Sequence, residues 1–143
     1  MPFVVLPMKL LMIHTTRFAY RTGHKSLDDV PENNATADYS DALVGFIHAE
    51  AEDVDNAKKV ETKLVKNLKW GARKNGTSHI ILHSFSHLSE SKAPADFTKD
   101  LFDRCQQRLE EAGYRTEQTP FGYFLDLELA APGLPTARIF TSF

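Results

Sequence analysis

Two histidines and three serines lie close together in the segment His83-Ser-Phe-Ser-His-Leu-Ser89, between an apolar run and a pattern typical of a helix. Ligands bind at the ends of strands in α/β sheets, where free backbone N–H groups can also stabilise an oxyanion. His87 is suited to acid–base chemistry near neutral pH, or to a hydrogen bond with a ligand hydroxyl. The serines are candidate hydrogen-bonding groups or nucleophiles: Ser84, Ser86 and Ser89. The alternative is a loop in which Ser89 or Ser91 only caps local backbone.

A second candidate segment, Thr119-Pro-Phe-Gly-Tyr-Phe124, combines aromatic side chains with a glycine. Gly122 has no side chain and lets a ligand or another backbone approach closely. In an extended strand, Phe121 and Tyr123 would share one face and Phe124 would lie on the other. The segment suits an aromatic-walled binding site, but aromatic side chains at the start of a strand equally fit a hydrophobic core.

Basic residues are concentrated between residues 57 and 76, where seven lysines and arginines stand against Glu61 alone, in a chain with a formal net charge of −2. On a helix most of them fall on one face, and Trp70 falls among them. Basic side chains around an exposed aromatic suit a phosphate backbone with an unstacked base. The residues proposed for nucleic-acid contact are Lys63, Lys66, Lys69, Trp70 and Arg73. A charged run of this kind also fits a solvated helix face.

Four histidines lie near the expected strand ends: His14, His48, His83 and His87. If the strands pair, their side chains could converge, and neutral imidazoles bind zinc or iron. Their spacing matches no established metal motif. A metal site built on these four histidines is therefore kept only as an alternative.

These candidates must be positioned by strands and helices that the hydrophobic pattern predicts. We expect strands over residues 9–14, 42–50, 79–86, 114–119, 121–130 and 137–143, and helices over 55–75 and 94–112. Residues 22–41 are polar and read as a long loop. The order predicts a mixed α/β domain with two helices against a sheet, over residues 8–143, with residues 1–7 as an N-terminal extension.

Composition limits the class of protein. A chain of 143 residues with 42% hydrophobic and 25% charged residues is typical of one soluble globular domain. Cys105 is the single cysteine, so an internal disulfide is impossible. No apolar run reaches the roughly 18–20 residues of a membrane helix, and no signal peptide is recognisable, so we expect a cytoplasmic protein without a membrane partner.

The motifs together resemble one family. Lys9–His14 with Thr15, Leu43–Glu50, Ser84–Ser89, and Pro120-Phe-Gly-Tyr-Phe124 followed by Gly133-x-Pro135 are similar to the N-terminal editing domain of archaeal-type threonyl-tRNA synthetases. The resemblance spans roughly Met8 to Ile139. It implies a D-aminoacyl-tRNA deacylase-like fold, in which a mixed sheet or barrel packs with two helices.

The resemblance also implies an activity and its residues. It implies hydrolytic removal of serine from tRNA(Thr), without a cofactor, by a homodimer that acts in trans as a free-standing version or in cis within a synthetase. His87 matches the active-site histidine. The positions that match substrate-binding residues are Ala49, Ser84, Ser86, Phe121, Tyr123, Phe124 and Arg138. If the substrate is a tRNA, the basic residues between 57 and 76 are the candidate tRNA-binding surface.

Two positions depart from the family pattern. Leu125 stands where the family has a catalytic lysine, and Arg138 stands where it has a glutamate. Two alternatives follow: a catalytically impaired tRNA- or nucleoside-binding module of the same fold, and a metal-dependent hydrolase built on the histidines. All versions without a metal require His87 and the aromatic–glycine segment 120–124 to face each other across one cleft.

Overall fold

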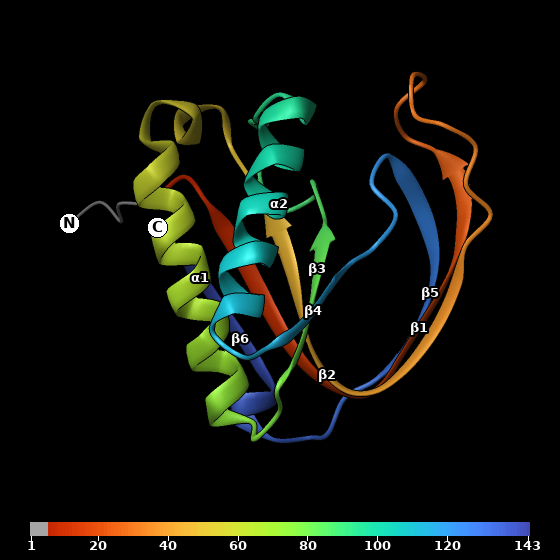
Figure 1. The fold of residues 1–143 in the computed structure, drawn as a ribbon, viewed down its shortest axis with the longest axis vertical. Helices are drawn as coiled ribbons and strands as arrows, with labels where there is room; N and C mark the ends of the chain where they lie inside the picture. The colour runs from red at the N-terminus through yellow and green to blue at the C-terminus, as the bar shows by residue number, and fades with distance from the viewer. Residues whose placement is uncertain (1–5) are drawn as a thin grey trace.

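The computed structural model describes residues 6–143 (Figure 1). The elements in chain order are β1 (Lys9–Lys25), β2 (Thr36–His48), the 3₁₀ helix η1 (Ala51–Asn56), α1 (Ala57–Lys74), β3 (His79–Ser84), α2 (Ala95–Glu111), β4 (Arg115–Gln118), β5 (Tyr123–Ala130), the 3₁₀ helix η2 (Pro135–Ala137) and β6 (Arg138–Ser142). Within residues 6–143, no helix is both long enough and apolar enough to cross a membrane.

One curved sheet contains all six of these strands, in the order β4-β3-β2-β1-β5, with β6 also paired to β1. β1 is long enough to hold two antiparallel partners along one edge, because Lys9–Ile13 pair with β6 and Arg17–Lys25 pair with β5, while β2 pairs along the other edge. β2, β3 and β4 run parallel, so their carboxyl ends lie at the same edge. The hairpin of β1 and β2, with β5 beside it, curls away from the helices (Figure 1).

The two helices cover one face of the sheet. Their apolar stripes, with Leu64 and Leu68 of α1 and Leu101 and Leu109 of α2, are fully buried against the strands. Glu61 of α1 accepts hydrogen bonds from the guanidinium groups of two arginines of α2, Arg104 and Arg108, and so joins the helices. Gly76 and Gly113 follow the helices with positive φ, the conformation that most often ends a helix.

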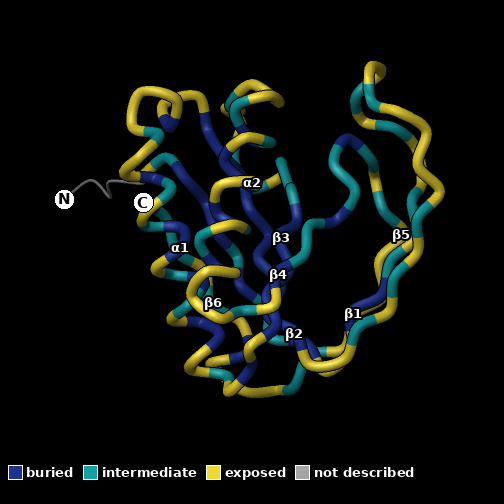
Figure 2. The backbone as a smooth tube through the Cα atoms, in the orientation of Figure 1, coloured by how far each residue is buried: buried dark blue, intermediate teal, exposed yellow. Residues whose placement is uncertain are grey.

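No helix formed by residues 6–143 lies on the opposite face of the sheet. A second core cluster lies there, with Phe18, Val44, Phe46 and Ile81. The register places Leu11 opposite Phe46 on one side and opposite Phe140 on the other, so these three side chains share this face. Phe140 is 55% exposed. In Figure 2 buried residues fill the centre of the sheet, while the curled hairpin and β5 are largely exposed.

The mixed α/β arrangement with two helices on a sheet is confirmed, and both helices lie where the pattern predicts them. The prediction of a loop over residues 22–41 is wrong, because only residues 26–35 lie between β1 and β2. The segment is polar because it belongs to an exposed arm in which β1 pairs with β2 and β5. Cross-strand ion pairs hold this arm, Arg17 with Asp38 and Arg21 with Asp126 among them. An exposed ribbon of this kind has the composition of a loop.

Candidate active site

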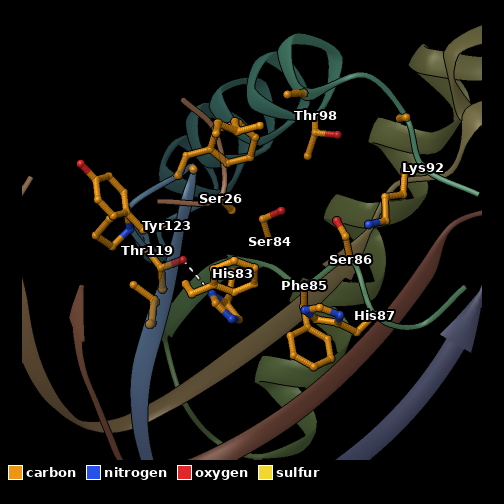
Figure 3. A pocket seen from close by; sticks show the side chains of 18 of the residues that line it. Ser26, His83, Ser84, Phe85, Ser86, His87, Lys92, Thr98, Thr119 and Tyr123 are labelled. Carbon is orange, nitrogen blue, oxygen red and sulfur yellow. Dashed lines mark hydrogen bonds between the residues drawn. The ribbon is translucent and has the colours of Figure 1, made fainter. Parts of the chain in front are cut away.

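A pocket of about 440 Å³ lies where β3 and β4 end at the edge of the sheet (Figure 3). This volume is within the range of roughly 300–1,000 Å³ that is typical of small-molecule sites. Four segments form the walls: the end of β3 and its continuation, the approach to α2, the start of β5, and the loop between β1 and β2. The lining side chains are Ser26, Leu27, His83–His87, Lys92, Ala93, Ala95, Thr98, Thr119–Leu125 and Leu127. The two segments that the sequence singled out, 83–87 and 120–124, therefore face each other across this pocket.

His87 lies at the mouth of the pocket between two aromatic rings. Its imidazole is 4.9 Å from the Phe85 ring, centroid to centroid, and 6.5 Å from the Phe124 ring, which it stacks against at an interplanar angle of 27°. The ring forms no hydrogen bond with any residue in 6–143. Aromatic contacts thus orient the imidazole while both of its nitrogens stay open to a ligand.

His83 forms the floor of the pocket and is structurally committed. Its Nδ1 is 2.8 Å from Thr119 Oγ1, a hydrogen bond that ties the end of β3 to the segment before β5. Burial, with a smaller contribution from the nearby charge of His87, lowers the pKa of His83 to about 4. His83 is therefore neutral at pH 7. It contributes a hydrogen bond and fills space at the floor of the pocket, but it contributes no charge.

The serines of this region divide into two groups. Ser84 and Ser86 line the pocket, and their hydroxyls form no hydrogen bond with residues 6–143. Ser89 and Ser91 instead donate hydrogen bonds to Glu50 Oε1, at 2.6 and 2.9 Å. The hydroxyls of Ser84 and Ser86 are available to a ligand. Ser89, which the sequence also suggested as a ligand-binding residue, instead holds its own segment to Glu50.

Glu50 and its partners fix the segment that carries His87. Lys9 of β1 donates to the other Glu50 oxygen, and both side chains are buried. Burial by itself would raise the pKa of the Glu50 carboxyl, but the hydrogen bonds from Lys9, Ser89 and Ser91 outweigh burial and lower the pKa. The residue is therefore an anion that holds the 85–93 segment against the end of β2.

His48 holds the same segment with both ring nitrogens. The Leu88 N–H donates to His48 Nδ1 at 3.0 Å, and His48 Nε2 donates to the Ser91 carbonyl at 2.7 Å. Because one partner is a donor and the other an acceptor, the ring must be neutral and protonated on Nε2. His48 is fully buried, so neither bond can be replaced by bulk water.

The aromatic–glycine segment forms the opposite wall. Gly122 has a φ of +86°, and a Cβ built on it would lie 2.5 Å from Val30 Cγ1, so this position requires glycine. Tyr123 lines the pocket, but its hydroxyl donates to the Pro31 carbonyl at 2.6 Å and accepts from the Asn33 N–H at 2.8 Å. Tyr123 thus holds the 26–35 loop against the pocket.

Two predicted substrate-binding residues lie away from the pocket. Ala49 is buried, and its carbonyl accepts a hydrogen bond from the Ala93 N–H at 2.9 Å. Arg138 begins β6, and its guanidinium donates to the Pro132 carbonyl at 2.9 Å. The register places Arg138 opposite Ile13, on the face of the sheet without helices. Neither side chain lines the pocket.

The basic residues of α1 form a separate surface. Trp70 is 39% exposed, and Lys74 Nζ lies 5.9 Å from the centroid of its ring. Within residues 6–143 no ion pair neutralises the other basic candidates, Lys63, Lys66, Lys69 and Arg73. No residue of α1 lines the pocket, so this surface is separate from it.

The hypothesis of a metal site built on four histidines is wrong for the described residues. His14 binds Asp41 at 2.8 Å, opposite Leu43 and far along β2 from His48, and His48 and His83 are satisfied as above. Between Leu6 and Phe143, no three His, Cys, Asp or Glu side chains converge to hold a metal. His48 and His83 lie at the carboxyl ends of the neighbouring strands β2 and β3, whereas His14 lies within β1, opposite Leu43.

Sequence reasoning missed several lining residues. Ser26 and Leu27 reach the pocket only because their N–H groups donate to the Gly122 carbonyl at 2.8 and 3.3 Å. Lys92 enters from the approach to α2. No local pattern marks these residues, since long-range contacts bring them to the site.

Comparison with known sequences decides the family. Residues 8–143 match the family described as the archaea-specific editing domain of threonyl-tRNA synthetase. The chain belongs to this family. It is 28% identical over 135 residues to the threonine–tRNA ligase of Thermococcus kodakarensis, 28% over 138 residues to that of Hyperthermus butylicus, and 27% over 134 residues to that of Methanosphaera stadtmanae. Each match covers 92% of this chain and 22% of the ligase. The chain thus spans about a fifth of the length of these relatives, and family membership supports a role in tRNA proofreading.

The fold of the editing domain is also found in a solved structure. The protein titled c-Myc DNA Unwinding Element Binding Protein superposes with a TM-score of 0.71, at 12% sequence identity, over 94% of this chain and 98% of that one. The expected D-aminoacyl-tRNA deacylase-like fold, a curled sheet packed with two helices, is confirmed.

Removing the His48 ring should loosen the segment that carries His87. We expect His48→Ala to speed hydrogen exchange of the Leu88 amide by at least ~10-fold relative to amides in β3, because its buried acceptor is lost at a cost of roughly 1–3 kcal/mol. Exchange measured by NMR or mass spectrometry checks this, with His24→Ala in the exposed hairpin as the control. Unchanged protection of Leu88 would show that His48 does not hold the segment.

Proposed function

We propose that this editing domain hydrolyses the ester bond of misacylated tRNA and removes serine from tRNA(Thr), in cis or in trans. The observation that carries the proposal is the single pocket that holds His87 opposite the aromatic–glycine segment 120–124. A flat adenine suits the aromatic wall formed by Phe121 and Phe124, and the aminoacyl ester then lies near His87 and the free serine hydroxyls. We also propose that residues 8–143 form one domain. Of the predicted extension 1–7, residues 1–5 lie outside the described part of the chain.

The chemistry demands little of the protein. An aminoacyl ester is already reactive, so positioning a water molecule and stabilising the oxyanion suffice. In this proposal His87 accepts a proton from the attacking water or donates one to the ribose oxygen, since its ring nitrogens have no protein partner within residues 6–143. His83 is neutral and buried beneath it, so His83 adds no positive charge to the site.

Discrimination between serine and threonine rests on one methyl group. Such a small difference is best exploited by a pocket that admits the smaller side chain and excludes the larger, the second-sieve principle. Ser84 and Ser86 supply small, polar side chains on the β3 side of the pocket. We propose that the seryl side chain lies against them.

The apolar side chain of Leu125 favours one rival function. It lines the pocket and can neither position water nor stabilise charge. A domain that binds tRNA or a nucleoside without turnover would therefore have the same architecture. The first experiment below separates the two functions. A cytoplasmic location stays a prediction.

The basic surface of α1 is proposed to contact tRNA. Lysines and arginines without acidic partners attract phosphates, and an exposed indole can stack on an unpaired base. The pocket would then hold the 3′-terminal adenosine while α1 contacts another part of the tRNA.

The uncovered face of the sheet is proposed to form a homodimer. An exposed apolar patch on a sheet face is typical of a protein–protein interface. Phe140 shares this face with Leu11 and Phe46, and it is more than half exposed.

Purified protein should release serine from seryl-tRNA(Thr) and leave threonyl-tRNA(Thr) intact. We expect His87→Ala to lower the rate by at least ~10-fold, because the variant loses the group that transfers the proton. Release of labelled amino acid measures both effects, with His24→Ala as the matched histidine control. Tight tRNA binding without any release above buffer would reject the deacylase and favour the binding module.

Neutralising the basic helix should weaken tRNA binding without changing the ester chemistry. The triple variant Lys63→Gln, Lys66→Gln, Arg73→Gln is expected to lose at least ~10-fold in affinity and to show a shallower salt dependence, since fewer counterions are released. Filter binding at several salt concentrations checks this. If the affinity and its salt dependence equal those of the wild type, the proposal that α1 contacts tRNA is rejected.

The oligomeric state tests the uncovered face. Sedimentation velocity should give twice the mass of the chain for the wild type, and Phe140→Glu should shift it to the monomer because a charge in an apolar interface is unfavourable. A wild-type monomer at tens of micromolar, or a Phe140→Glu dimer, would contradict the proposed interface.

A further inference from the structure

Apart from the two histidines, Lys92 is the one basic residue among the side chains that line the pocket, and no acidic residue is among them. Its side chain extends from the segment before α2 into the pocket, on the side where Ser86 and His87 lie (Figure 3). It forms no hydrogen bond or ion pair with residues 6–143. The ammonium group is thus a charge that the described part of the protein leaves unneutralised inside a binding site.

Both neighbours of Lys92 are anchored to the end of β2. The Ser91 hydroxyl donates to Glu50, its carbonyl accepts from His48, and the Ala93 N–H donates to the Ala49 carbonyl at 2.9 Å. The backbone at Lys92 is therefore fixed by the network that positions His87. Only the side chain of Lys92 is free, and it points into the pocket. Lys92 is exposed, but hydrogen bonds of both neighbouring residues hold its backbone in place.

The apolar walls of the pocket strengthen electrostatic interactions beside them. Phe124, Leu125 and Leu127 supply an apolar surface from β5, and His83 is neutral. A cation beside an apolar wall interacts more strongly with a developing negative charge than one surrounded by water on all sides. Ester hydrolysis develops that charge on the carbonyl oxygen.

We propose that Lys92 is a catalytic residue of this pocket, whose ammonium stabilises the oxyanion formed during hydrolysis of the aminoacyl ester. This assignment rests on the proposed function. The water oxygen bonds to the carbonyl carbon, the bond from that carbon to the ribose oxygen breaks, and the proton lost by the water is transferred to the ribose oxygen. Lys92 keeps its protons throughout and contributes only charge and a hydrogen bond.

Kinetics of three variants test the role of Lys92. We expect Lys92→Ala to lower kcat for seryl-tRNA(Thr) by at least ~10-fold with less than a twofold change in KM, because the interaction forms only in the transition state. Lys92→Arg should keep most of the activity. Lys99→Ala is the matched control, since the Lys99 ammonium is paired with Asp103 on α2 outside this pocket. Lys92 is exposed, and equal unfolding midpoints would establish that the variants fold.

Two analogues of 3′-seryl-adenosine provide a readout that is independent of turnover. One carries a neutral amide in place of the ester, and the other carries an anionic tetrahedral phosphonate. Lys92→Ala should weaken the phosphonate by at least ~10-fold and the amide by less than twofold, as measured by calorimetry.

The outcomes are distinguishable. Wild-type activity with an equally active Lys92→Ala variant would overturn the assignment of Lys92 and leave the deacylase intact. Equal weakening of both analogues, or a change in KM alone, would show that Lys92 binds the nucleotide and would also overturn the assignment. A wild-type protein that neither hydrolyses the ester nor binds either analogue would reject the proposed function, and the role of Lys92 with it.

Discussion

The buried carboxylate of Glu50 is the interaction on which the rest of the site depends. Removing a charge from water costs several kcal/mol, so a buried anion persists only where it is paired and fully hydrogen-bonded. Lys9, Ser89 and Ser91 supply those bonds, and His48 adds two more between the end of β2 and the same segment. The 85–93 segment has no helix or strand of its own. It is nevertheless fixed, since any displacement would leave buried polar groups without partners.

The polar groups of this region thus form two sets, those with hydrogen-bond partners in the protein and those without. Glu50, His48 and His83 are buried and satisfied, and they determine where the chain runs. The hydroxyls of Ser84 and Ser86, the imidazole of His87 and the ammonium of Lys92 face the pocket without protein partners in residues 6–143. Ser84 and Ser86 are half-buried and His87 and Lys92 are exposed, so water can reach these groups and a ligand can take its place. A rigid supporting shell around a few open groups is what positions a reactive ester accurately.

The two kinds of tRNA contact would use different parts of the fold. Positive charge on α1 acts over several ångströms and requires no exact geometry, whereas the pocket must distinguish ester and amino acid at contact distance. No residue of α1 lines the pocket, and α1 is joined to α2 through Glu61 and its arginines. The domain could therefore lose catalysis through a change in the pocket, such as Leu125, and still bind nucleic acid through α1.

The sequence alone determined the local features of the protein. Helical spacing of apolar residues located α1 and α2, the concentration of lysines on α1 was visible in the chain, and the motifs around His87 and Gly122 indicated the editing-domain family that residues 8–143 match. Tertiary structure decided what depends on distant residues. The polar stretch 22–41 belongs to an exposed arm in which β1 pairs with β2 and β5. Lys92 lies in the pocket because hydrogen bonds to His48, Ala49 and Glu50 fix its two neighbours. The four histidines do not form a metal site because His14 lies away from the others and His48 and His83 are bonded to other partners. The composition of a segment indicates whether it is exposed to solvent. Strand register and long-range hydrogen bonds determine which side chains are in contact.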